Sequence, residues 1–242
     1  MPVVKWFWRK ATNRSDAPRL RPRSDEAVAA QKVDLADLAP SRDRYLGQAA
    51  YLQLSIFEDL SRLVATAPTV AGKDAISQAA AISLRRYERL SDEIRRAGST
   101  PADAMEPYTT EIDYFQSVTQ GKDFYESLVT SHITSGIVDD CFARLAAGLP
   151  RADAERFAAI YAVESHDELL AEQIRVGIAA DPRLAARLAL WGRRLVGDCI
   201  LVARSSLATP PASATDEARI EPVFTELIAA HTRRMDALGL TA

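Results

Sequence analysis

Apolar residues recur every three or four positions through most of this chain, which is the spacing of one face of an α-helix. Pro68, Gly98 and Pro150 interrupt the pattern and are expected to end helices. We expect helices over these segments: 42–67, 73–97, 108–118, 123–149, 152–180, one that begins at 182, and a last one that ends at 239. The stretch STPADAMEPY (99–108) is expected to be a loop and 205–215 a linker, and no segment has the alternation of a β-strand.

The lengths of these segments predict an all-α fold, an antiparallel four-helix bundle with one or two additional C-terminal helices. A helix of about 25 residues spans about 37 Å, which suits long antiparallel helices joined by short connections. No period of about 33 to 47 residues repeats along the chain, and this argues against a helical solenoid. The bundle domain is expected to cover residues 41–242.

Residues 1–40 differ in composition and are expected to form a basic, largely disordered N-terminal arm. Seven basic residues face one acidic residue in 1–24, although the whole chain has a net charge of −3. Within the arm, KWFWRK (5–10) places three aromatic rings between cations. Such a segment can pack on its own protein, on an anionic membrane surface or on nucleic acid.

The composition of the chain and the motifs that it lacks exclude several classes of protein. No window has the eighteen or so apolar residues of a membrane span, and the start lacks the apolar run of a secretory signal. The two cysteines, Cys141 and Cys199, are expected to be buried thiols in a reducing cytoplasm, so the predicted localisation is cytoplasmic. No P-loop, dinucleotide fingerprint, CxxC pair or nucleophile elbow occurs.

Polar residues interrupt the apolar stripes near the middle of the predicted helices. They are Gln53, Ser83, Arg86, Ser135 and His166, and Val163 lies three positions before His166. The i, i+3 spacing of 83/86 and 163/166 places two side chains on one helix face. Four-helix bundles hold two iron ions in this way, with one Glu from each of two helices and Glu-x-x-His from each of the other two. An amide, two hydroxyls, a guanidinium and an isopropyl group do not supply that chemistry, and a permanent cation at residue 86 repels a metal ion.

Residues 42–240 resemble the ferritin-like proteins of actinobacteria, which are related to the bacterial tRNA hydroxylase that acts on 2-methylthio-isopentenyl-adenosine. The stretches that carry the resemblance are AYLQLSIFEDLSRLVATAPT, ISLRRYERL, AMEPY, SGIVDDCFARLA, LALWGRRLVGD and HTRRMDALGL. The resemblance implies a ferritin-like fold. It also implies, for members with an iron centre, carboxylate ligands at the positions of Gln53, Ser83, Ser135 and Val163 and histidines at those of Arg86 and His166. By this comparison only His166 is retained, and ISLRR is similar to a Glu-x-x-His helix that has lost both ligands.

Two interpretations of the interior remain open at this stage. In the first, no metal is bound, and the polar residues hydrogen-bond one another around Arg86. A buried guanidinium needs a carboxylate or another acceptor, and the candidates are Glu58, Glu126, Asp139, Asp140 and Glu164. In the second, a displaced metal ion lies between neighbouring helices. Its alternative donors are His132, Asp139, Asp140, Glu164, His166 and Asp167.

The leading hypothesis is a non-catalytic ferritin-like protein that has lost most di-iron ligands and serves as an interaction or ligand-binding protein. It needs no cofactor, its partner is an unidentified protein or small molecule, and its long helices make a homodimer plausible. The alternative is a tRNA-hydroxylase-like non-haem iron oxygenase with an atypical metal site, for which iron would be the cofactor. A third hypothesis gives KWFWRK the main role, as a contact to a membrane surface or to nucleic acid.

Overall fold

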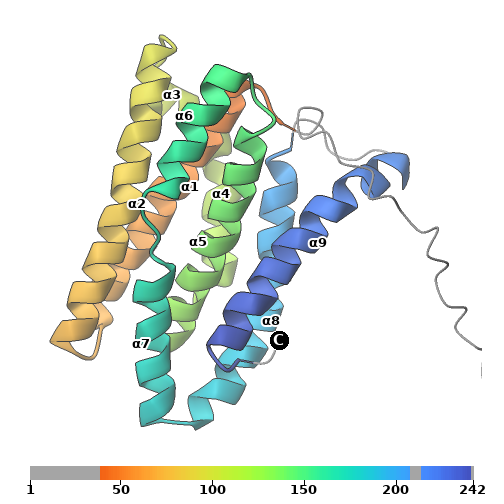
Figure 1. Cartoon of the computed structure of the whole chain (residues 1–242). Coiled ribbons are helices and arrows are strands. Elements are labelled where there is room, and N and C mark those ends of the chain that lie inside the picture. Colours follow the sequence, from red (N-terminus) through yellow and green to blue (C-terminus); the bar gives the residue numbers. More distant parts are fainter. Residues whose placement is uncertain (1–38, 208–213, 241–242) are drawn as a thin grey trace, which may run out of the picture. The chain divides into compact units, whose positions relative to one another are not determined.

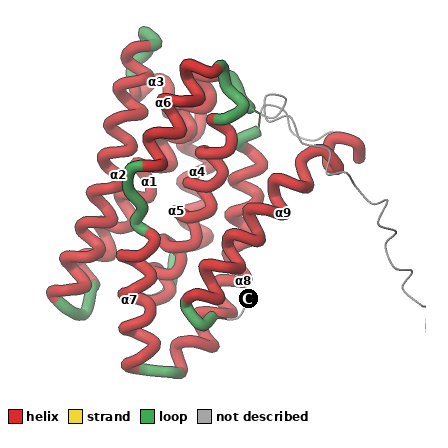
Figure 2. Tube along the Cα trace, viewed as in Figure 1, coloured by secondary structure: helices red, strands yellow, loops and turns green. Residues whose placement is uncertain are grey.

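The computed structural model describes residues 39–207 and 214–240, and every regular element in these ranges is helical (Figures 1 and 2). The predicted arm with KWFWRK and the middle of the predicted linker lie outside the described residues. The elements are α1 (Arg42–Thr66), α2 (Val70–Arg96), α3 (Pro101–Met105), the 3₁₀ turn η2 (Glu106–Tyr108), α4 (Thr109–Thr119), α5 (Phe124–Ala146), α6 (Arg151–Ala162), α7 (Asp167–Ala180), α8 (Arg183–Ser205) and α9 (Ala214–Ala237). The predicted all-α class is confirmed.

Local capping residues fix where the helices begin. Ser41, Thr69, Thr100 and Asp123 each precede a helix, and each side chain accepts a hydrogen bond from the backbone N–H three residues further on. These bonds satisfy N–H groups that have no partner inside the helix. At the other end of α2, Gly98 has a φ of 85°, the left-handed conformation that closes a helix at low cost in glycine.

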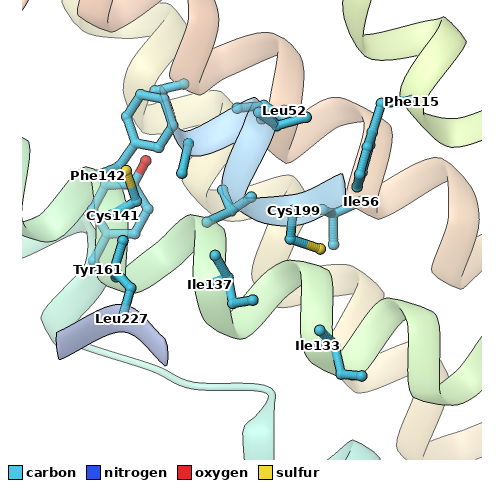
Figure 3. Packing of buried hydrophobic residues seen from close by; sticks show 14 of the residues in the cluster. Leu52, Ile56, Phe115, Ile133, Ile137, Cys141, Phe142, Tyr161, Cys199 and Leu227 are labelled. Atoms are coloured by element: carbon cyan, nitrogen blue, oxygen red, sulfur yellow. The ribbon is translucent and has the colours of Figure 1, made fainter. Parts of the chain in front are cut away.

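Helix α5 lies at the centre of the bundle, where it packs against α1, α6, α7, α8 and α9. Its buried residues lie on nearly all of its faces, and Figure 3 shows Ile133, Ile137 and Phe142 within the apolar core. At one level of the bundle, Tyr45 of α1 stacks on Phe157 of α6 with 5.2 Å between ring centroids, and its hydroxyl donates to the Phe142 carbonyl at 3.0 Å. This contact ties α1, α5 and α6 together.

Several sequence predictions about element boundaries are wrong. Helix α2 begins at Val70, because Thr69 caps it, and not at residue 73. The stretch 99–108 is mostly helical, because Thr100 caps α3 and Pro101 fits its first turn. Most importantly, the predicted helix 152–180 is two helices, α6 and α7, separated by residues 163–166.

The cysteines agree with their prediction. Cys141 and Cys199 are free, buried thiols, and burial raises the pKa of each to about 12. Across residues 39–207 and 214–240, none of the helices combines the length and the apolar character that a membrane crossing requires.

Substitutions at two glycines test how closely the helices pack. A Cβ at Gly47 of α1 would lie 2.1 Å from the Ala104 carbonyl oxygen of α3, and backbone there cannot move aside easily. We expect Gly47→Ala to lower the free energy of unfolding by about 1–3 kcal/mol. Gly197→Ala is the matched control: no atom lies within 4 Å of its added Cβ, so removal of a helical glycine should raise stability by about 0.5–1 kcal/mol. Urea unfolding followed by circular dichroism measures both, and equal effects would contradict the close contact between α1 and α3.

Candidate functional site

The break between α6 and α7 faces the side chain of Arg86 on α2. Arg86 is 3% exposed. Its guanidinium donates to the carbonyl oxygen of Glu164 in the break at 2.5 Å and to that of Tyr161 in the last turn of α6 at 3.5 Å. The carbonyls at the end of a helix have no partner inside it and carry its negative dipole. Arg86 therefore serves as a cationic cap for the end of α6, supplied by a different helix.

Asp139 of α5 neutralises this cation. Its Oδ2 accepts from the Arg86 guanidinium at 2.5 Å, and its Oδ1 accepts from the Gln53 amide of α1 at 3.0 Å. The Nε2 atom of His166 lies 3.3 Å from Arg86 Nη1 and 3.6 Å from Asp139 Oδ2. The side chains of Gln53, Arg86, Asp139 and His166, which we call the Arg86 cluster, thus join α1, α2, α5 and the start of α7.

Burial controls the protonation of the groups around the cluster. It lowers the pKa of His166, which the neighbouring Asp139 only partly opposes and Arg86 reinforces. Burial also raises the pKa of Tyr161, whose ring centroid lies 5.4 Å from the Arg86 guanidinium carbon. A neutral imidazole and a neutral phenol therefore surround one ion pair.

The structure brings together some of the predicted polar residues and leaves out others. Gln53 and His166 belong to the Arg86 cluster. Ser83 is fully buried, but its hydroxyl has no hydrogen-bond partner in the part of the chain that the structure describes. Ser135 donates to the His132 carbonyl at 3.3 Å. Val163 does not line the interior: it is 62% exposed, because the helix ends just before it.

The alternative metal donors are held apart by basic partners. Asp139 pairs with Arg86, the Glu164 carboxylate with Arg85 at 2.7 Å, and Asp167 with Arg234 at 3.2 Å. Asp140 also pairs with Arg234, and His166 belongs to the Arg86 cluster. The Nδ1 atom of His132 lies 3.9 Å from Asp167. Among the described residues, no group of three or more His, Cys, Asp or Glu is placed to hold a metal ion.

A second polar cluster, which the sequence did not reveal, anchors α9 to the bundle. Arg234 donates to Asp140 of α5 at 2.6 Å and to Asp167 of α7. Gly136 of α5 makes room for it, because a Cβ there would lie 2.9 Å from the guanidinium carbon. The i, i+3 spacing of His231 and Arg234 was the available signal, but it does not identify the partners of either residue.

Comparison with protein families agrees with this architecture. A family model described as the ferritin-like domain of actinomycetes matches residues 42–212. The chain belongs to this family. A search of the curated proteins finds no match. The family resemblance of the sequence is thereby confirmed at the level of the ferritin-like fold, and α9 lies beyond the matched segment.

The interior of this ferritin-like domain does not fit a pair of iron ions. Two hard cations need several carboxylates at one level, and Asp139 is the one carboxylate in the Arg86 cluster. Its two oxygens are already bound to Arg86 and Gln53. A permanent guanidinium charge at the same level adds repulsion to this shortage of ligands.

Removal of the central cation tests the Arg86 cluster. Arg86→Met leaves Asp139 nearly buried without its cation and leaves two carbonyls without a donor, so we expect a loss of about 3–5 kcal/mol of unfolding free energy. The double variant Arg86→Met, Asp139→Asn should be more stable than the single one, since no unpaired charge remains. Arg85→Met is the control: this half-exposed ion pair should contribute less than about 1 kcal/mol. If urea unfolding gives similar losses for Arg85→Met and Arg86→Met, the central role of Arg86 is wrong.

Buried histidines make the free energy of unfolding depend on pH. Burial, opposed by Asp167 and reinforced by Arg234, His166 and His231, lowers the pKa of His132 to about 4. In an unfolded chain the value is about 6.5, so as the pH falls the unfolded chain binds this proton first. The stabilisation of the fold by the neutral imidazole is complete above about pH 6.5 and is lost towards pH 4. The free energy of unfolding should therefore fall by about 2 kcal/mol between pH 7.5 and pH 5. His132→Gln should remove that part of the pH dependence in urea titrations, and an unchanged slope would argue against a buried neutral imidazole.

Proposed function

We propose that this ferritin-like protein works without a di-iron centre, as a non-catalytic interaction or ligand-binding protein. The observation that carries the proposal is the Arg86 guanidinium, bound at once to a carboxylate of α5 and to carbonyls at the break after α6. Fold alone does not imply activity, and function has to be argued from the site. Here the site is built around one ion pair within the protein, that of Arg86 with Asp139.

The proposal accounts for the residues at the family's ligand positions. If the ancestor of this chain held iron, the change at residue 86 to arginine would replace metal charge with guanidinium charge. Asp139 would then neutralise a side chain in place of an ion. The exposed Val163 supports the same view, since a ligand at that position could not reach the interior after the helix had broken.

The alternative function is an oxygenase related to the tRNA hydroxylases, with iron held in an unorthodox way. It rests on the sequence resemblance, and no grouping of donor side chains among the described residues supports it. An oxygenase of this kind would give an optical band that depends on both ferrous iron and oxygen. We expect no such band from the purified protein.

Elemental analysis tests the proposal. Protein purified from cells supplied with iron should contain far less than one iron per chain, and addition of ferrous iron should not change its unfolding midpoint, because a ligand stabilises a protein only when it binds the folded state. A bundle with an intact di-iron site, treated in parallel, is the positive control. Two irons per chain at near-full occupancy would falsify the proposal.

The partner of this protein is predicted from the sequence alone. An unidentified protein or small molecule is expected, a homodimer is plausible, and KWFWRK is expected to contact a membrane surface or nucleic acid if it has a role of its own. These predictions do not depend on the Arg86 cluster and can be wrong without affecting the proposal that no di-iron centre is used.

A further inference from the structure

A cleft of about 560 Å³ opens at the end of the bundle where α1 and α4 end and α5 begins. Its walls come from the last turns of α1, the end of α4, the loop 120–123 and the first two turns of α5. Its volume lies within the range of about 300–1,000 Å³ found for small-molecule sites. None of its lining residues belongs to the Arg86 cluster, so the cleft is a separate feature of the molecule.

The carboxylates of the cleft are already bound within the protein. Asp59 accepts from the Gln116 amide at 3.2 Å and from Arg62, and burial raises its pKa. Asp123 caps α5 by accepting from the Glu126 N–H at 2.9 Å, and it also accepts from Arg187. These carboxylates therefore have little remaining capacity to bind a cationic ligand.

Three donor groups that line the cleft have no partner among the described residues. Ser131 is only 6% exposed, it lines the cleft, and its hydroxyl makes no hydrogen bond within the described residues. The Ser127 hydroxyl, one turn earlier on the same face of α5, is likewise unbonded there, and the Lys122 ammonium forms no ion pair with a described residue. The two hydroxyls and the ammonium can therefore donate to a group that enters the cleft.

These donors come from the loop before α5 and from its first turns, which lie against each other. Gly121 lets the loop lie directly on the first turns of α5, since a Cβ there would be 2.2 Å from the Ser127 nitrogen. Lys122 is thereby held beside the N-terminus of a 23-residue helix, the end that carries partial positive charge. Although the Asp123 carboxylate already caps this helix, one ammonium and two hydroxyls that line the same cleft favour an anionic group.

We propose that this cleft binds a small organic anion, a carboxylate or a phosphate ester. The anionic group lies at Lys122, Ser127 and Ser131, and the apolar part of the ligand packs on Leu63 and Phe124, which also line the cleft. The inference rests on the proposed function in taking the chain to be a binding protein, and it names the ligand class that the proposed function leaves open.

A titration of ¹⁵N-labelled full-length protein with benzoate, phenyl phosphate and neutral benzamide tests this inference. We expect at least one of the two anions to shift the amide signals of residues 120–131 with a dissociation constant of about 1 mM or tighter, and benzamide to bind at least tenfold more weakly. The preferred anion distinguishes a carboxylate from a phosphate ester. No shift in this segment with either anion at about 10 mM, or equal binding of benzamide, overturns the inference.

Paired variants locate the bound anion. Lys122→Gln should weaken binding about tenfold or more, whereas Lys73→Gln, an exposed lysine outside the cleft, should leave it unchanged. Ser131→Ala should weaken binding several-fold. Ser117→Ala is its control, because the Ser117 hydroxyl lines the cleft but donates to the Tyr114 carbonyl at 2.7 Å. Binding that is insensitive to both Lys122→Gln and Ser131→Ala overturns the inference.

This test is independent of the metal question. Anion binding that fails while iron stays absent rejects the cleft alone. Iron found at full occupancy, with anion binding intact, rejects the proposed function and leaves the cleft as a second site in an iron protein.

Discussion

The rest of the interior depends on the need to satisfy one buried guanidinium. A cation that is 3% exposed must be given a counter-charge and acceptors by the protein itself. Asp139 supplies the charge, and the carbonyls of Glu164 and Tyr161 supply the acceptors. Because these groups come from α5 and from the end of α6, the arginine of α2 fixes three helices with respect to one another.

This requirement also explains why one long helix has become two. Carbonyls bound to Arg86 are lost to the helical hydrogen-bond ladder, and the Ser165 hydroxyl accepts the Asp167 N–H at 3.1 Å just before α7. A break inside a bundle normally leaves unsatisfied backbone groups, and here Arg86 donates to two of the carbonyls, those of Glu164 and Tyr161. A ferritin-like bundle with a cation at its centre can thus remain well packed without a metal.

Much of the fold, but less of the candidate site, could be predicted from the sequence. Periodicity, together with the interruptions at Pro68, Gly98 and Pro150, located the long helices, and Arg86 was identified as the unusual interior residue. The break at 163–166 could not be predicted, because the apolar stripe continues across it and its cause lies about 80 residues earlier in the chain. Asp139 was one of five candidate partners, and only the rotation of α5 selects it. The cleft could not be predicted either, since two segments about 50 residues apart in the sequence form it.

An anomalous-scattering map of crystals grown with ferrous iron, recorded at the iron absorption edge, examines the bundle interior most directly. The account predicts electron density for the Arg86 guanidinium between Asp139 and the Glu164 carbonyl, and no anomalous peak at that level of the bundle. Two peaks between α1, α2, α5 and α7, with Arg86 turned away from Asp139, would contradict it.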